Sequence, residues 1–185
     1  MQTTAARVLS DAAVRQIVQG IEKNEIVLVL GPGVATTKAP DGKIKPLVSC
    51  LANELAKELD METDADHDDL VLVATLFETK FNKQVLRKKV LDFYSAPRES
   101  APILNDLVNL PFNLILNTTP DLLLSAAYKT NGLISSFEYY SIKKRQESIL
   151  FEQDQGIPLI FNLFGSTIES ASRVLPNRLN IKGMP

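Results

Sequence analysis

The stretch that most constrains the fold is Glu25–Thr37, with the sequence EIVLVLGPGVATT. Its apolar run, Ile26 to Leu30, leads directly into Gly31-Pro32-Gly33. An unbroken apolar run that is rich in β-branched residues and ends at glycine predicts a strand buried on both faces. In doubly wound α/β folds, a glycine turn at the carboxyl end of such a strand is where a phosphate-bearing ligand binds. Thr36 replaces the third glycine of the dinucleotide pattern, so an ordinary strand-ending turn remains the alternative.

Length and composition favour one domain, spanning residues 1–185, of an ordinary globular kind. The net charge of −2 gives no electrostatic reason to expect binding to nucleic acid or to an anionic membrane. The single cysteine, Cys50, excludes an internal disulfide and suits a reducing compartment. The N-terminus has no signal-peptide pattern, and no apolar run approaches the ~20 residues of a membrane-spanning helix. We therefore expect a cytoplasmic protein.

Helical spacing begins early in the chain. Ser10-Asp11 is a capping residue followed by an acid, which predicts a helix start. Apolar residues then recur at i, i+3, i+4 and i+7 from Val14 to Ile21, so we expect this helix to lay one face on the core. Pro46 is expected as the first residue of the next helix, after a polar loop at 38–43.

Strands and helices alternate through the rest of the chain. Apolar spacing predicts helices at 70–77, 85–94, 103–110 and 120–131, the last capped by Thr119, and strands at 113–117, 135–141 and 158–164. This alternation implies parallel connections and an α/β, Rossmann-like, mostly parallel sheet flanked by helices. The strand ends at 31, 117 and 164 should then line one edge of the sheet.

The acidic stretch 60–69 contains the only histidine, His67. Its spacing matches no calcium-loop pattern, and it lacks the glycine that such a loop needs. It is therefore interpreted as a solvated loop that ends by capping the next helix, and no metal site is expected.

Two later segments carry a family resemblance, together with the glycine turn and the leucine helix that starts near Pro46. Residues 109–123 read NLPFNLILNTTPDLL, and residues 158–166 read PLIFNLFGS. The first resembles a segment in which "LPF" precedes a strand ending in Thr-Thr-Asn-Tyr-Asp, and the second resembles a later strand ending in Leu-His-Gly-Ser. Both segments belong to the sirtuin-like domains of prokaryotic antiviral defence proteins.

The resemblance implies an NAD-binding Rossmann-like fold. Active members hydrolyse NAD to nicotinamide and ADP-ribose when a fused or separate sensor or effector protein responds to infection. It further implies a homo- or hetero-oligomer, and it implies that this chain is the N-terminal part of a longer domain or protein.

Two substitutions depart from the family pattern. Alignment on Asp121 puts Thr119 where the family has its catalytic Asn, and alignment on Gly165 puts Phe164 where it has its catalytic His. Phenylalanine cannot exchange a proton, so it cannot act as a general base. Threonine can hydrogen-bond, but it lacks the paired donor and acceptor of an amide. Normal turnover is therefore not expected, although Asp121 is a possible substitute base.

The residues that would bind NAD or ADP-ribose are largely retained. Gly31, Gly33, Val34, Ala35 and Thr36 are expected to offer backbone N–H groups and a hydroxyl to a pyrophosphate. Thr118 and Ser166 are expected to contact ribose. The matched positions Thr119, Asp121 and Gly165 complete the expected site.

Three functions stay open from the sequence. The first is a degenerate domain that binds NAD or ADP-ribose, or serves in assembly, without normal catalysis. The second is an active NAD hydrolase that uses Asp121, or the more remote Glu138 or Glu169, as base. The third is a protein-interaction scaffold with an empty cleft. A protein deacylase is the weakest possibility, because a chain with one cysteine lacks the zinc-holding quartet of true sirtuins.

Overall fold

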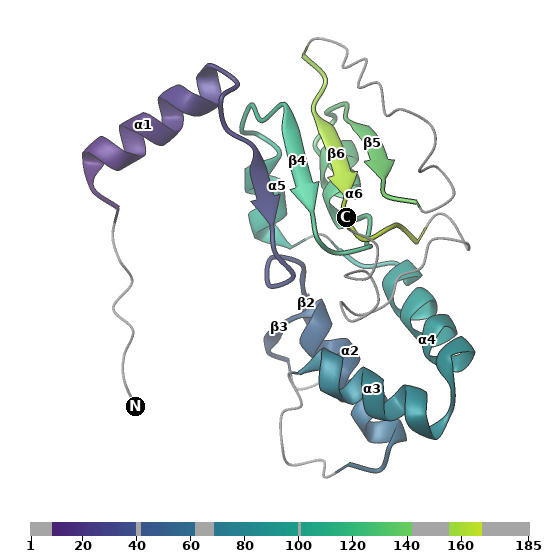
Figure 1. Cartoon of the computed structure of the whole chain (residues 1–185). Coiled ribbons are helices and arrows are strands. Elements are labelled where there is room, and N and C mark those ends of the chain that lie inside the picture. The colour runs from purple at the N-terminus through teal and green to yellow at the C-terminus, as the bar shows by residue number, and fades with distance from the viewer. Residues whose placement is uncertain (1–8, 40–41, 62–68, 100, 142–155, 168–185) are drawn as a thin grey trace, which may run out of the picture.

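A four-stranded parallel sheet forms the centre of the fold. The computed structural model describes residues 9–39, 42–61, 69–99, 101–141 and 156–167. The strand order is β1-β4-β6-β5, and every neighbouring pair is parallel (Figure 1). The strands are β1 (Leu28–Leu30), β4 (Leu114–Asn117), β5 (Ser136–Tyr139) and β6 (Leu159–Asn162). This arrangement confirms the predicted α/β, Rossmann-like architecture.

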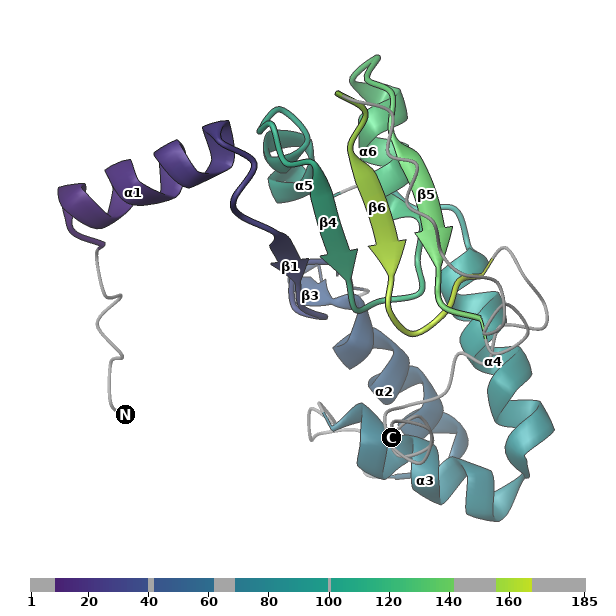
Figure 2. The same ribbon diagram turned by 45° about the horizontal axis from the view of Figure 1, so that its top comes forward.

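The described helices fall into two groups around the sheet. They are α1 (Asp11–Glu22), α2 (Leu47–Glu58), α3 (Leu70–Lys80), α4 (Lys83–Ser95), α5 (Pro102–Leu107) and α6 (Leu123–Thr130). Helices α5 and α6 lie on one face of the sheet, whereas α2, α3 and α4 lie beyond the edge toward which all four strands point (Figures 1 and 2). The carboxyl edge of the sheet therefore faces a small helical lobe.

One hydrophobic core joins the sheet to both groups of helices. Ile115 and Ile160 are paired across β4 and β6 and are almost completely buried. They belong to the same buried cluster as Leu104 and Leu124, which come from α5 and α6, and as Leu51 of α2. The lobe and the sheet are thus parts of one packed unit, which positions the loops between them.

Several helix boundaries agree with the sequence predictions. The Ser10 side chain accepts a hydrogen bond from the backbone N–H of Ala13 at 3.3 Å, as expected of an N-cap. Asp69 caps α3 by accepting from the N–H of Leu72 at 3.0 Å. Helix α2 starts at Leu47, one residue after the position predicted from Pro46.

A short hairpin follows the glycine turn where only a polar loop was predicted. Strands β2 (Thr36–Lys38) and β3 (Ile44–Pro46) pair antiparallel, with Thr36 opposite Pro46. The β-branched pair Thr36-Thr37 favours extended backbone, and the partner strand satisfies its hydrogen bonds. The glycine turn therefore leads into a strand and does not lead directly into a helix.

The predicted start of the sixth helix was wrong. Helix α6 begins at Leu123 and not at Pro120, so Thr119 is not its N-cap. The Thr119 hydroxyl donates instead to Asn117 Oδ1 at 2.9 Å. The Asp121 side chain satisfies the start of the helix instead, because its Oδ1 accepts a hydrogen bond from the N–H of Leu123 at 2.9 Å. The helix ends at Thr130, next to the predicted Asn131-Gly132 stop, and Gly132 has a φ of 69°.

Two burial predictions were also wrong. The first strand, β1, is an edge strand and is not buried on both faces, because Val29 is 58% exposed. Alternate side chains of a strand point to opposite faces, and α5 and α6 lie on one face of the sheet, while none of the described helices lies on the other (Figures 1 and 2). Most of the apolar stripe of α1 does not face the core either, since α1 points away from the sheet (Figures 1 and 2), and of the stripe only Ile21 is buried in the core cluster. The exposed fractions are 45% for Val14, 41% for Ile17 and 47% for Val18.

The described residues contain neither a membrane-spanning helix nor a cluster of metal-binding side chains. No helix there has the length and apolarity needed to cross a membrane. No group of three or more His, Cys, Asp and Glu side chains there could hold a metal ion. His67 and most of the acidic stretch lie outside the described residues.

Candidate functional site

The carboxyl ends of three strands meet at one edge of the sheet, as predicted. Leu30 is in register with Asn117, and Asn117 with Asn162. Beyond Asn117, the Thr118 N–H and hydroxyl both donate to the carbonyl oxygen of Leu30, at 3.1 and 2.9 Å. The N–H of Leu163 donates to the Asn117 carbonyl oxygen at 2.9 Å. These bonds tie the loops after the strands together at the site.

A buried amide network supports this edge. Asn117 Nδ2 donates to Asn162 Oδ1 at 3.1 Å and to the Thr119 carbonyl oxygen at 3.0 Å. Asn162 Nδ2 donates to the Asp121 carbonyl oxygen at 3.2 Å. Both asparagines are buried, Asn162 completely. Because buried amides need partners, the network holds the backbone of residues 119–121 in one conformation.

The glycine turn is open on its outer side. A Cβ added at Gly31 or Gly33 would meet no atom within 4 Å, and neither residue has a positive φ. Packing and backbone conformation therefore do not require glycine at either position, and a ligand can approach the backbone closely there. The Val34 N–H is already used, because it donates to the Gly31 carbonyl oxygen at 3.2 Å.

Asp121 is the most unusual polar group of the site. The residue is only 4% exposed, and its Oδ2 has no hydrogen-bond partner among the residues that the structure describes. A buried carboxylate oxygen without a partner carries a desolvation cost that a hydrogen-bond donor would remove. Asp121 lines two cavities, one of about 10 Å³ beside Gly31 and Thr119, and one of about 320 Å³.

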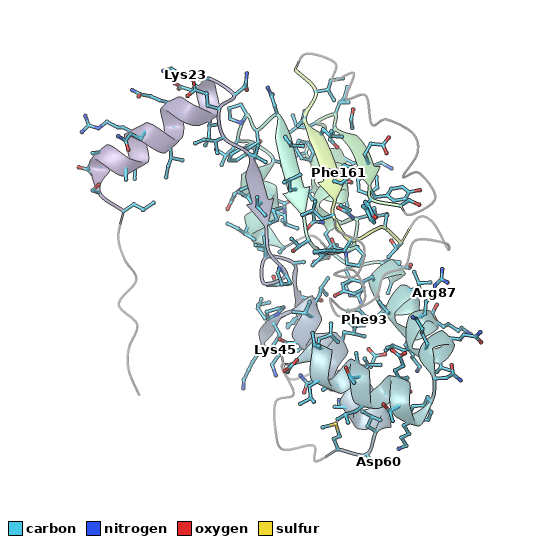
Figure 3. The ribbon with its side chains drawn as sticks, viewed as in Figure 1. Lys23, Lys45, Asp60, Arg87, Phe93 and Phe161 are labelled. Atoms are coloured by element: carbon cyan, nitrogen blue, oxygen red, sulfur yellow. The ribbon has the colours of Figure 1, made fainter. Side chains whose placement is uncertain are left out.

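The larger cavity lies between the sheet edge and the helical lobe. Its wall includes Leu47 at the start of α2, the stretch 94–98 at the end of α4, the stretch 121–123, Ala126 and Thr167. Phe93 lies at the end of α4 that is nearest the sheet (Figure 3). A cavity of this volume is at the lower end of the range for small-molecule sites, which is about 300–1,000 Å³.

Tyr94 and Arg98 bring polar chemistry to that cavity. Burial raises the pKa of the Tyr94 hydroxyl well above its usual value, and the nearby Asp121 raises it further, whereas Arg98 lowers it. Tyr94 therefore stays protonated at neutral pH. The Asp121 carboxylate and the Arg98 guanidinium both act on the Tyr94 hydroxyl, so these two charged groups lie on the same part of the cavity wall.

The structure places the predicted site residues in three environments. Gly31, Val34, Ala35, Thr119 and Asp121 surround the small cavity together. The segment 163–167 is tied to the loop after β4, because the Thr167 N–H donates to the Pro120 carbonyl oxygen at 3.2 Å. Three predicted residues line neither cavity. They are Thr36 in β2, Gly33 in the glycine turn, and Thr118, whose hydroxyl already donates a hydrogen bond to the Leu30 carbonyl oxygen.

The remaining predicted residues differ in burial. Ser166 is completely buried, and Gly165 adopts a φ of 98°, which favours glycine for backbone reasons alone. Phe164 is half-buried, directly before this turn. Glu138 is exposed in β5 and lines neither cavity, while Glu169 lies outside the described residues.

Sequence reasoning did not single out Asn117, Asn162, Tyr94 or Arg98. The two asparagines had a usable signal, because each is the polar last residue of an otherwise apolar strand, LILN and LIFN. Tyr94 and Arg98 had none. They reach the site only because α4 ends beside the loop that precedes α6.

The fold and this edge define an α/β protein of Rossmann-like architecture, with a pocket partly lined by Asp121 and Arg98 at the carboxyl ends of its parallel strands, where open α/β sheets bind ligands. Comparison with protein-family models and with curated proteins finds no match to this chain.

Proposed function

We propose that this chain is a catalytically degenerate sirtuin-like domain that binds NAD or ADP-ribose at the carboxyl edge of its sheet. The observation that carries the proposal is the unpartnered Oδ2 of buried Asp121, which lines the 320 Å³ cavity. A ribose hydroxyl or a carboxamide N–H is the kind of donor that this oxygen lacks. The proposal also rests on the resemblance of residues 109–123 and 158–166 to that family.

The glycine turn supports the same ligand class. Gly31 and Gly33 have open space where a side chain would stand, so a pyrophosphate can contact the backbone. The loops that carry Gly31 and Asp121 line one cavity. A dinucleotide or ADP-ribose is long enough to reach from the turn to Asp121.

The chemistry around Thr119 supports binding without normal hydrolysis. The Thr119 side chain is buried, and its hydroxyl donates to Asn117 Oδ1. It is thus committed to the supporting network and has no amide with which to orient a ribose or a water. Phe164 offers no acid or base. In this proposal the domain works in a cytoplasmic defence protein, together with a fused or separate sensor or effector and as an oligomer.

Calorimetric titration with NAD and ADP-ribose tests the proposal. Wild type should bind at least one of them, and Gly33→Trp should lose the affinity, because the indole fills the space above the turn. Ile134→Trp is a matched control, since Ile134 is 74% exposed and precedes β5 at the opposite edge of the sheet. Absence of binding in wild type would refute the proposal and favour a scaffold with an empty cleft.

One observation favours NAD hydrolysis as a second candidate. Asp121 lines the larger cavity and has one carboxylate oxygen without a hydrogen-bond partner among the described residues, so it is the candidate in this cavity to accept a proton from an attacking water. Nicotinamide release by wild type, lost in Asp121→Asn with the fold retained, would establish this candidate. Wild type that binds NAD without releasing nicotinamide would exclude it.

A further inference from the structure

Arg98 is the positively charged residue among those described along the larger cavity. It follows α4 in the stretch 94–98, opposite the loop that carries Asp121. Among the described residues, no ion pair within 4.0 Å joins Arg98 to Asp121. The cavity wall thus presents a cation and a carboxylate that do not neutralise each other directly.

The guanidinium group is held in place by its own chain segment. Nη1 donates to the carbonyl oxygens of Phe93 and Ala96, the latter at 3.1 Å. The guanidinium carbon lies 4.3 Å from the centre of the Phe93 ring. Donors on Nε and Nη2 remain outside these bonds. A group that is fixed in this way loses little side-chain entropy when it binds a ligand.

The segment that follows the glycine turn differs from that of a dinucleotide-binding fold. In doubly wound proteins, the glycine turn opens directly into a helix whose N-terminus stabilises the pyrophosphate. Here the glycine turn opens into β2, and helix α2 starts only at Leu47. The turn is therefore not followed directly by a helix N-terminus that would stabilise a phosphate, and the described cation at this edge that lines a cavity is Arg98.

We propose that Arg98 binds the phosphate of the ligand, while Asp121 Oδ2 accepts a hydrogen bond from a hydroxyl or amide of the same molecule. The ligand class is a phosphate ester with a neighbouring donor, of which ADP-ribose is the example. This inference rests on the proposed function and adds to it the residue that recognises the anion.

Isothermal titration of the full chain with ADP-ribose and, separately, with inorganic pyrophosphate tests the inference. The variants are Arg98→Gln and Arg98→Lys, and Lys88→Gln is the control, because it removes the same charge from an exposed position of α4. Arg98→Gln should lower the affinity for both ligands by about 10- to 100-fold, as expected for loss of a charge-assisted hydrogen bond. Lys88→Gln should leave both affinities unchanged.

Arg98→Lys keeps the charge without the planar fork, so its affinity should lie between those of wild type and Arg98→Gln. It also keeps the test valid if Arg98→Gln fails to fold. ADP-ribose binding that is equal in wild type and both variants would overturn the inference and leave the proposed function standing. Pyrophosphate binding that depends on Arg98, without any binding of ADP-ribose or NAD, would support the anion site and refute the nucleotide proposal. Binding of none of the three ligands would overturn both.

Discussion

Truncation of Asn162 to alanine is the sharpest test of the buried network. The change removes the Nδ2 donor to the Asp121 carbonyl oxygen, at 3.2 Å, and the Oδ1 acceptor for Asn117, at 3.1 Å. Each lost bond costs about 1 kcal/mol net, and buried groups that are left unpaired add about 1–3 kcal/mol. Asn162 is completely buried, so water does not replace these bonds easily. We expect Asn162→Ala to lower the free energy of unfolding by about 2–4 kcal/mol.

Urea denaturation followed by circular dichroism measures this loss. The midpoint should fall by about 1–2 M with an unchanged slope, because stability changes while the exposed surface does not. Asn109→Ala is the control, since Asn109 is exposed and its one side-chain bond reaches the Asn105 carbonyl oxygen at 2.8 Å. It should change stability by less than about 0.5 kcal/mol. A loss of that small size in Asn162→Ala would refute the view that the network holds the edge together.

Two further predictions concern the core and alkaline pH. Leu51→Ala should lower the free energy of unfolding by about 2–5 kcal/mol, because Leu51 is almost completely buried. Ile17→Ala, at an exposed position, should lower it by less than about 1 kcal/mol. Equal losses in urea denaturation would contradict the observed burial. The pKa of Tyr94 is raised in the folded protein above its ordinary value of 10.0. As the pH rises above 10.0, the unfolded chain therefore loses this proton before the folded chain does, and the folded state loses stability relative to the unfolded state. Tyr94→Phe removes this contribution, so wild type should lose up to about 1.4 kcal/mol more per pH unit than the variant at alkaline pH. Parallel stability curves between neutral and alkaline pH would refute this assignment.

Local signals predicted the elements of this fold well. Three helix ends depend on residues within a few positions of one another. They are the N-cap of α1 at Ser10, the N-cap of α3 at Asp69 and the end of α6 just before Gly132. Hydrogen bonds of this range are encoded in the local sequence. The alternation of strands and helices predicted the parallel sheet for the same reason, because short apolar periods report the element type directly.

Predictions failed where a residue had a choice of distant partners. Threonine is a common N-cap residue, but the Thr119 hydroxyl donates to Asn117, which is itself bonded to Asn162. The apolar run before Gly31 predicts complete burial, yet β1 lies at the edge of the sheet, and strand order is not visible in the strand itself. The stripe on α1 is a true helical pattern whose burial depends on where the helix lies.

The sequence by itself determined the class of fold, the glycine turn and the polar ends of the strands, since each depends on neighbouring residues. Only the tertiary structure decided which of those ends form a pocket. It brought the end of α4, with Tyr94 and Arg98, against the loop of Asp121, and among the described residues it gave one oxygen of that carboxylate no partner. The physical reason is that burial and electrostatic contact depend on distance in space, and α4 and that loop are separated along the chain by all of α5 and β4.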